Sequence, residues 1–142
     1  MMDYNLALLL GALLSLLAAL AHLWCIAVGP AGYRLMGAGE RMARAAEQGR
    51  RFPTLITLGI ALVLAIWAAY ALSGAGLIGP LPLLRAGLCA ITAVYLLRGF
   101  AGPLLLRNTG HSRRFIVVSS LICAGYGLVH LLGLVQVWGG LG

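Results

Sequence analysis

Charged residues cluster along the chain and leave four long apolar stretches between the clusters. These stretches cover residues 5–29, 53–72, 83–102 and 115–138. Since an α-helix rises about 1.5 Å per residue, about 20 apolar residues cross the roughly 30 Å hydrocarbon core of a bilayer. Each stretch is long enough to do so. The pattern therefore predicts an all-α integral membrane protein in which residues 1–142 form one domain of four transmembrane helices.

The connecting segments predict how consecutive helices pair. Loops at 30–52 and 103–114 are rich in arginine and follow the first and the third span. Between the second and third spans, the segment Ser73–Gly76 and the prolines Pro80 and Pro82 favour a tight turn, because these residues do not continue a helix. We therefore expect two helical hairpins of like orientation, each with its arginine-rich loop at the same end.

The first of these loops is long enough to hold structure of its own. Glu40 and Arg44 are spaced i, i+4, and so are Glu47 and Arg51. Opposite charges at this spacing support a helix. A short helix over 38–48 is therefore predicted at the membrane surface, where it would serve as a connector or as a docking surface for lipid headgroups or a partner.

Two segments of the chain resemble each other. The pattern G-P-x-x-x-R-x-x-G occurs at 29–37 and again at 102–110, and an Arg-Arg-Phe triplet opens the returning span at 50–52 and at 113–115. Such a match is expected from a tandem duplication, with the hairpins related by an axis along the membrane normal. The alternative is that Gly-Pro ends a helix anywhere and that arginine pairs collect on the cytoplasmic side.

Composition and charge fix the expected orientation. The chain is 62% hydrophobic and 9% charged, with a net charge of +7, and its ten basic residues are all arginine. Nine of them lie in or next to the two arginine-rich loops, and only Arg85 lies toward the other side. The positive-inside rule then predicts cytoplasmic loops and non-cytoplasmic termini in a bacterial inner membrane. Anionic lipid headgroups account for the charge, so no nucleic-acid partner is expected.

Small and polar residues recur at steps of three and four within the spans, which places them on one helix face each. Such faces allow helices to approach closely in lipid, so we expect them to form the seams of the bundle, in this chain or in a homo-oligomer or a complex with another membrane protein. In the outer two spans the faces are formed by Gly11, Ser15, Ala18, His22 and Cys25 and by Ser119, Cys123, Tyr126, His130 and Gly133. In the inner two spans they are formed by Thr57, Ala61, Ala65 and Ala69 and by Arg85, Cys89, Thr92 and Tyr95.

Ionisable side chains inside a span are costly and face protein or water. This singles out a candidate intramembrane polar site formed by His22, Cys25, Cys123, Tyr126 and His130. Each imidazole would either take part in binding a solute or form a structural hydrogen bond to a backbone carbonyl or hydroxyl. No cofactor is predicted, although haem or copper ligation stays open.

A further pair of candidates lies in the third span. Arg98 would either extend to the headgroups or hold a hydrogen bond or an anion inside the protein, together with Tyr95.

The acidic residues bear on the function. All three, Asp3, Glu40 and Glu47, lie outside the spans, so a paired-carboxylate mechanism is excluded and no catalytic residue is predicted. The expected function is a non-enzymatic module that binds or passes a small solute. The alternative is an accessory or structural subunit of a larger membrane complex.

One short segment favours an enzyme instead. Residues 40–45, Glu-Arg-Met-Ala-Arg-Ala, followed by Phe52-Pro53, resemble the first cytoplasmic loop of the membrane-associated eicosanoid and glutathione metabolism family. The resemblance covers about a dozen residues and implies a four-helix membrane enzyme that uses glutathione. Gln48 and Arg51 stand where that family has Asn and Glu.

Overall fold

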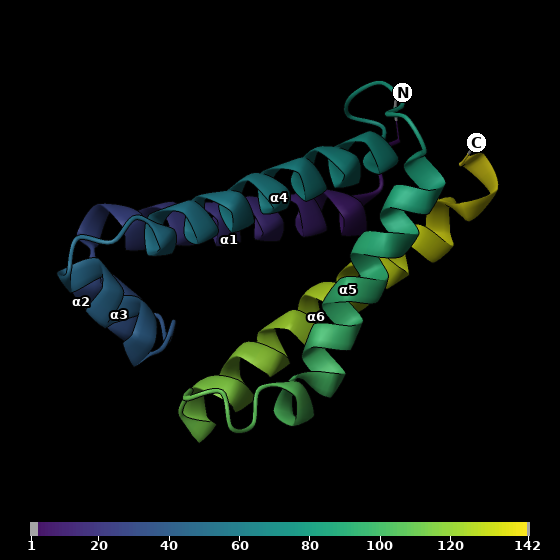
Figure 1. The fold of residues 1–142 in the computed structure, drawn as a ribbon. Helices are drawn as coiled ribbons and strands as arrows, with labels where there is room; N and C mark the ends of the chain where they lie inside the picture. Colours follow the sequence, from purple (N-terminus) through teal and green to yellow (C-terminus); the bar gives the residue numbers. More distant parts are fainter. Residues whose placement is uncertain (1–2, 142) are drawn as a thin grey trace.

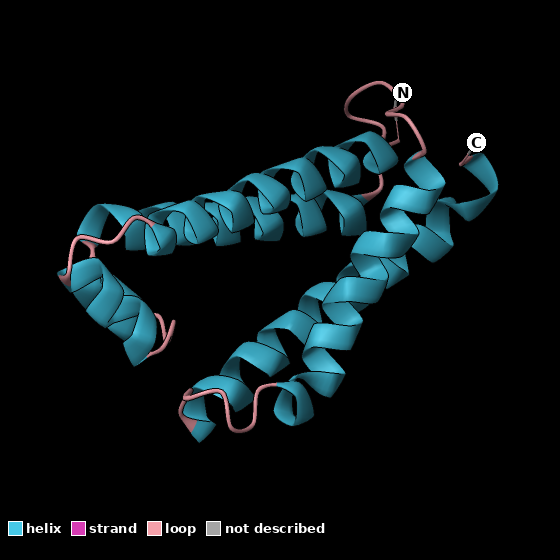
Figure 2. Ribbon diagram, in the orientation of Figure 1, coloured by secondary structure: helices cyan, strands magenta, loops and turns pink. Residues whose placement is uncertain are grey.

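The computed structural model describes residues 3–141, which form helices joined by short loops (Figure 2). Four helices are long: α1 (Leu6–Val28), α4 (Phe52–Ala75), α5 (Leu84–Leu105) and α6 (Arg113–Val137). Three are short: α2 (Pro30–Leu35), α3 (Glu40–Glu47) and the 3-10 turn η1 (Trp138–Gly140). The all-helical fold with four long helices confirms that part of the prediction.

The four long helices have the composition and length of membrane spans. Each contains an 18-residue window with a mean hydropathy between 1.6 and 2.4, and at most 33% of any such window is buried inside the protein. Most of the apolar surface therefore faces outward, which is unfavourable in water and favourable in lipid. The four long, apolar helices accordingly indicate a membrane protein.

The long helices run in two pairs that diverge from a common end (Figure 1). Helix α1 lies along α4, and α5 lies along α6. The pairs meet near the two termini, where Asn5 Nδ2 donates a hydrogen bond of 2.8 Å to Gln136 Oε1 and Gly133 packs against Leu8.

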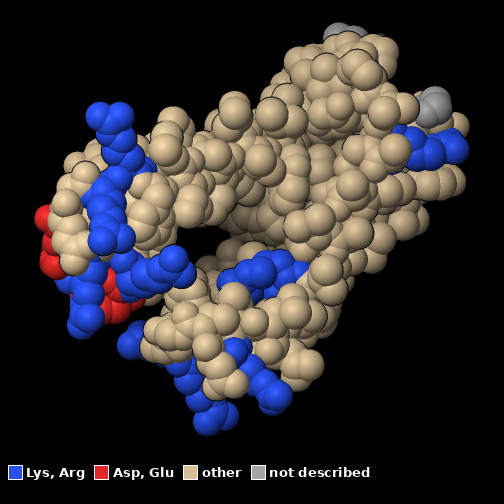
Figure 3. Space-filling model, in the orientation of Figure 1, with Lys and Arg blue, Asp and Glu red and all other residues tan. Residues whose placement is uncertain are grey.

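At the opposite end a second contact links the pairs. His111 Nδ1 lies 2.9 Å from the carbonyl oxygen of Gly37, and the ring of Phe115 packs on Gly37. Between the two contact regions the surface is hollowed (Figure 3). Arginine side chains gather around the end that bears α2 and α3, while the Arg85 guanidinium lies at the other end, where it donates to the carbonyl oxygens of Trp138 and Leu141.

The ends of α1 and α4 differ from the predicted ends, and the causes are local. Helix α1 ends at Gly29, whose φ of 84° suits glycine, and Pro30 then opens α2, which was not predicted. Helix α4 continues three residues past its predicted end and stops at Gly76, whose N–H bonds to Ser73 and whose left-handed conformation forms the usual helix C-cap. Ser73 Oγ, inside the helix, accepts from Leu81 N and donates to Gly79 O, so it organises the turn that follows.

The two Gly-Pro pairs of the repeated sequence pattern have different conformations. Gly29-Pro30 separates two helices, whereas Gly102-Pro103 lies inside α5, which continues to Leu105. The predicted loop boundary at residue 103 is therefore wrong. A proline ring normally clashes with the Cβ atom of the preceding residue when that residue is helical. Gly102 has no Cβ atom and so avoids this clash. Gly102 is also held against Ser120 of α6, while nothing lies within 4 Å of the position of a Cβ at Gly29.

The short helix predicted at 38–48 is confirmed as α3, with one difference in its ion pairs. Arg44 Nε lies 3.5 Å from Glu40 Oε1, at the predicted i, i+4 spacing. Glu47 pairs with Arg34 of α2 at 2.6 Å instead of with Arg51. The partner of Glu47 is therefore an arginine of the neighbouring helix α2, and not the arginine four residues later in the sequence.

The faces predicted as seams are largely the buried ones. In α1 these are Gly11, Ser15 and Cys25, and in α4 Thr57 and Ala61. The exception is Ala65, which is exposed, because α4 instead buries Leu64 and Ala68. The real stripe drifts by one position, as a helix of 3.6 residues per turn does when its buried face is followed over several turns.

Candidate functional site

A buried hydrogen bond links the two helix pairs near the middle of the bundle. Ser15 of α1 and Tyr95 of α5 place their hydroxyl oxygens 2.7 Å apart, and Ser15 is 0% exposed while Tyr95 is 5% exposed. Because α1 and α5 belong to different pairs, this bond fixes their relative position. It also holds the Tyr95 ring in a single orientation.

His130 of α6 lies beside this bond. Its ring centroid is 5.0 Å from that of Tyr95, and the side chain is 0% exposed. The imidazole packs on Gly11 of α1, where an added Cβ would come within 2.9 Å of the ring carbon Cε1. Glycine at this position therefore makes room for the ring.

A backbone carbonyl of α6 determines which nitrogen of the His130 ring carries the proton. Nδ1 lies 2.7 Å from the carbonyl oxygen of Tyr126, which can only accept a hydrogen bond. In the neutral imidazole Nδ1 therefore carries the proton, and Nε2 is left as an acceptor. That Nε2 is buried and has no hydrogen-bond partner among residues 3–141.

A second buried polar atom without a partner lies on α5, on the face that also bears Tyr95. The hydroxyl of Thr92, one turn before Tyr95, makes no hydrogen bond within the described part of the chain. Thr92 is 4% exposed. Unpaired buried polar atoms cost free energy, so the Thr92 hydroxyl and His130 Nε2 are the two candidate atoms for an additional hydrogen bond.

Aromatic rings surround the junction. Trp67 of α4 and Tyr126 of α6 both make edge-to-face contacts with Tyr95, with centroid distances of 5.0 and 5.5 Å. The candidate site is therefore a small group of hydrogen-bonding atoms inside a wall of aromatic rings from α4, α5 and α6, and α1 closes it with Ser15 and Gly11.

The sequence-predicted site residues divide into two groups. Tyr126 and His130 lie at this junction, together with Tyr95, and Cys123 is half-buried one turn away on α6. His22 and Cys25 lie elsewhere, toward the end of α1 that joins α2. The five-residue set is thus not gathered in one place.

His22 and Cys25 each have a local partner. His22 Nδ1 lies 2.7 Å from the carbonyl oxygen of Ala18, and its ring is half-buried. The thiol of Cys25 points to the carbonyl oxygen of Gly32 at 3.7 Å and packs with Tyr33 and Ala43 beneath α2 and α3.

Arg98 is half-buried and forms hydrogen bonds to α6, and none to Tyr95 is present in the described residues. Its guanidinium donates to Ser119 Oγ at 2.8 Å and to Ser120 Oγ at 3.1 Å, both on α6. Tyr95 is engaged by Ser15 instead. Arg98 therefore joins α5 to α6 one turn closer to the arginine-rich end than the junction.

Sequence analysis did not assign Ser15, Thr92, Trp67 or Gly11 to the site. Ser15, Thr92 and Gly11 had a signal, since they lie on the predicted seams. Trp67 had one as well, because tryptophan in a membrane helix usually lies near an interface and this one lies well inside its span.

Outside the spans, one arginine forms ion pairs with two glutamates. The Arg34 guanidinium donates from Nη2 to Glu40 Oε1 at 2.9 Å and from Nη1 to Glu47 Oε1 at 2.6 Å, which ties α2 to both ends of α3. These hydrogen bonds raise the pKa of Arg34, and the one to Glu40 holds the pKa of that carboxyl below its usual value.

Within residues 3–141, no group of three or more His, Cys, Asp or Glu side chains is placed to hold a metal ion. Comparison of the chain with protein-family models, with characterised proteins and with solved structures gives no match.

Proposed function

We propose that this chain is a non-enzymatic membrane module that binds or passes a small solute at the junction of its two helix pairs. The observation that carries the proposal is the buried, unpartnered Nε2 of His130. An ionisable side chain with free hydrogen-bonding capacity inside a membrane span is expensive, and function is the usual reason for such a group.

The chemistry of the junction limits the solute. Because Nε2 of the neutral ring is an acceptor, the solute must present a hydrogen-bond donor, such as a hydroxyl, an amine or a proton. The Thr92 hydroxyl of α5 can donate or accept as well, and the aromatic wall favours a compact molecule with an apolar body.

The proposed setting is a bacterial inner membrane with the arginine-rich end in the cytoplasm and both termini on the other side. Support comes from the distribution of arginine: the loops between α1 and α4 and between α5 and α6 lie at one end, linked by the contact between Gly37 and His111. Anionic headgroups of the inner leaflet are the expected partners of that end.

The two helix pairs are proposed to derive from a tandem duplication. In favour, Gly37 and Gly110 occupy equivalent places in the repeated pattern and both have a positive φ, of 75° and 84°. The repeated Arg-Arg-Phe triplets also both lie at the start of a returning helix, α4 or α6. The different conformations of the two Gly-Pro pairs would then reflect later divergence.

The two histidines provide the test, because they share one local geometry and differ in burial. Both Nδ1 atoms lie 2.7 Å from the carbonyl oxygen four residues earlier, but only His130 is fully buried at the junction. We expect native mass spectrometry of the purified protein to detect a small molecule on the wild type and on His22→Gln, and to find it lost from His130→Gln.

Three results would contradict this proposal. The first is retention of the molecule by His130→Gln, and the second is equal loss from both variants. The third is a wild-type protein that carries no small molecule and conducts none in vesicles. Thermal unfolding of the three proteins in one detergent controls for loss of the fold.

One observation favours the accessory-subunit alternative. An apolar groove of about 180 Å³ lies between α4 and α5, lined by Ile66, Trp67, Tyr70, Gly87, Ala90, Ile91 and Val94. Small residues on α5 would let a helix of another membrane protein, or of a second copy, approach closely there. Purification in mild detergent that returns only copies of this chain would count against a hetero-oligomeric complex.

A further inference from the structure

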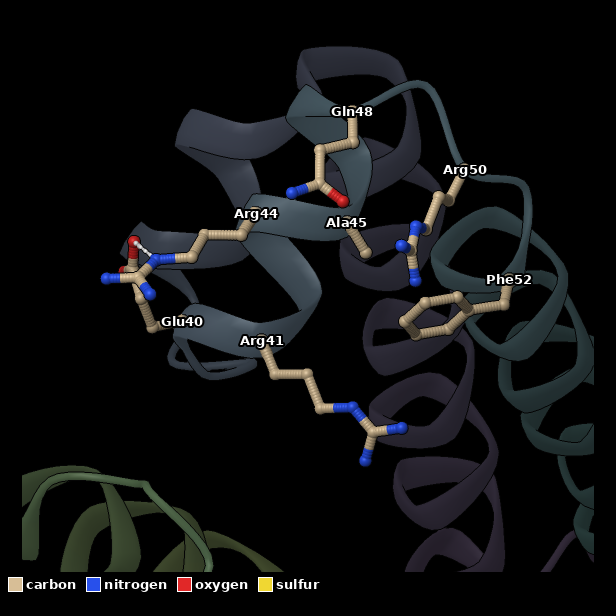
Figure 4. A pocket seen from close by; sticks show the side chains of 7 residues that line it. All are labelled: Glu40, Arg41, Arg44, Ala45, Gln48, Arg50 and Phe52. Carbon is tan, nitrogen blue, oxygen red and sulfur yellow. Dashed lines mark ion pairs between the residues drawn. The ribbon is translucent and has the colours of Figure 1, made fainter.

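A pocket of about 450 Å³ lies between α3 and the start of α4, outside the junction and at the arginine-bearing end. Its lining residues are Glu40, Arg41, Arg44, Ala45, Gln48, Arg50 and Phe52. Figure 4 shows Arg50 and Phe52 on the α4 side of the pocket and Gln48 at the end of α3, while Arg44 turns outward to Glu40. Three guanidinium groups and one amide thus border a single opening.

The charge of this pocket is not balanced by carboxylates. Glu40 and Glu47 are held by Arg34 from the neighbouring helix α2, and Glu40 also lies 3.5 Å from Arg44. Arg41 and Arg50 therefore have no carboxylate partner in the portion of the chain that the structure describes. Two free guanidinium groups at the mouth of a concave site attract an anion, and guanidinium is the side chain best suited to phosphate oxygens.

The depth of the pocket along the membrane normal indicates that its phosphate ligand belongs to a lipid headgroup. Phe52 forms one wall, and Arg41 lies over its ring at 5.8 Å from the centroid. Aromatic and arginine side chains at the first turn of a span mark the headgroup region. One turn further along the same face of α4, Ile56 is 49% exposed, and Gly59 beyond it has nothing within 4 Å of where a Cβ would lie.

We infer that this pocket binds the phosphodiester headgroup of an anionic phospholipid, with Arg41 and Arg50 on the phosphate oxygens and an acyl chain along the exposed face of α4. A free phosphate would use the same arginines but would gain nothing from Phe52 and Ile56. The inference is independent of the solute site, because no residue is shared between the pocket and the junction.

Adjacent arginines allow a matched test. Arg50 lines the pocket, whereas Arg51 is exposed and does not, so Arg50→Gln and Arg51→Gln remove the same charge from neighbouring positions. The full chain is placed in bilayers of phosphatidylcholine with a minor fraction of phosphatidylglycerol. Electron paramagnetic resonance then measures how strongly the protein restricts spin-labelled phosphatidylglycerol compared with spin-labelled phosphatidylcholine. High salt screens the diffuse attraction of the surface and leaves short-range contacts.

At high salt we expect wild type and Arg51→Gln to prefer phosphatidylglycerol equally. Both lipids offer the same phosphate, so the preference arises because the Arg50 charge repels the quaternary ammonium of phosphatidylcholine. Arg50→Gln should therefore lose about tenfold of that preference, the order of a like-charge interaction near a protein surface. Arg50→Lys should lose less, because it keeps the charge but not the forked geometry.

Equal lipid preferences for Arg50→Gln and Arg51→Gln would contradict the proposal that this pocket binds the headgroup. Displacement of the labelled lipid by millimolar inorganic phosphate would show a free-anion site and overturn the lipid assignment. Circular dichroism of each variant in the same bilayers controls for folding.

Discussion

Gly99 illustrates how single residues set the distance between helices in this protein. It lies where α5 crosses α6, and an added Cβ would overlap the backbone of Ala124. Backbone cannot move aside as a side chain can, and in lipid close packing supplies much of the attraction between helices. The contact at Gly99 therefore contributes directly to the α5–α6 pair.

We expect Gly99→Ala to lower the free energy of unfolding by about 1–3 kcal/mol, the usual cost of overpacking a core. Gly125→Ala is the matched control, because Gly125 lies in α6 next to Ala124 with nothing within 4 Å of its added Cβ. That variant should be neutral, or more stable by up to about 1 kcal/mol through helix propensity. Titration of the micelle-bound protein with denaturing detergent measures both, and equal destabilisation of the two would argue against a close crossing at Gly99.

At the residue scale, the sequence predicts faces better than it predicts neighbours. Periodicity placed His130, Tyr126 and Ser15 on buried faces, because a helix fixes which of its own side chains share a side. It could not tell that Tyr95 would bond to Ser15 instead of approaching Arg98, since that depends on how α5 is rotated against α1. The histidines were likewise treated alike, and only the packing of four helices separates a buried ring from a half-buried one.

Among the elements, the α2–α3 unit combines ion pairs with a small apolar core, in which Tyr33 and Ala43 pack on Cys25 of α1. Arg34 binds both carboxylates of α3, and the charged side chains involved are 40–50% exposed. Isolated surface ion pairs contribute little to stability, and a short helix is marginal by itself. Because Glu40 begins α3 and binds Arg34, the order of this short helix should depend in part on the ionised state of Glu40.

This dependence gives a pH prediction. The folded-state pKa of Glu40 lies below its ordinary value of 4.5, so its contribution is fully present above that value and is lost as the pH falls through the lowered pKa. Amide-exchange protection of residues 40–47, relative to the unstructured chain at each pH, should fall in this acid range while protection of α4 persists.

The variant Glu40→Gln should have low protection of α3 already at neutral pH, because the neutral amide cannot pair with Arg34. It should also have a smaller acid-dependent change. Protection of α3 that stays constant across the acid range in the wild type would show that the ion pairs do not order this helix.

The predictability of the elements follows from the same physics. Long apolar runs determine that four helices exist, so their cores were located correctly. Their ends depend on particular side chains: Ser73 stays helical because its hydroxyl bonds to the next turn, and Pro103 stays helical because Gly102 precedes it. Helix α2 was missed because six residues opening with proline have no periodicity of their own.

For the whole molecule, the two helix pairs touch from the termini to the Ser15–Tyr95 hydrogen bond and again at the arginine-bearing end, and a hollow lies between these contacts (Figure 3). Near the termini the contact includes the bond from Asn5 to Gln136, and at the other end it includes the approach of His111 to Gly37. This arrangement could not be predicted from the sequence, because lipid does not favour one pairing of apolar helices over another and the deciding contacts involve few residues. The arrangement nevertheless constrains the topology.

Because Gly37 and His111 are within hydrogen-bond distance, the loops that carry them must lie in the same compartment. In a chain whose Cys25, Cys89 and Cys123 are replaced by alanine, we expect single cysteines at Met36 and Thr109 to react with a membrane-impermeant maleimide only after the inner membrane of a bacterial host is opened. A cysteine at Leu77, at the opposite end of the molecule, should react in intact spheroplasts. Met36 and Thr109 in different compartments would contradict the contact and with it the fold. If both react from outside and Leu77 from inside, the fold stands and the orientation drawn from arginine is wrong, so the packing of the helices and their direction across the membrane are tested separately.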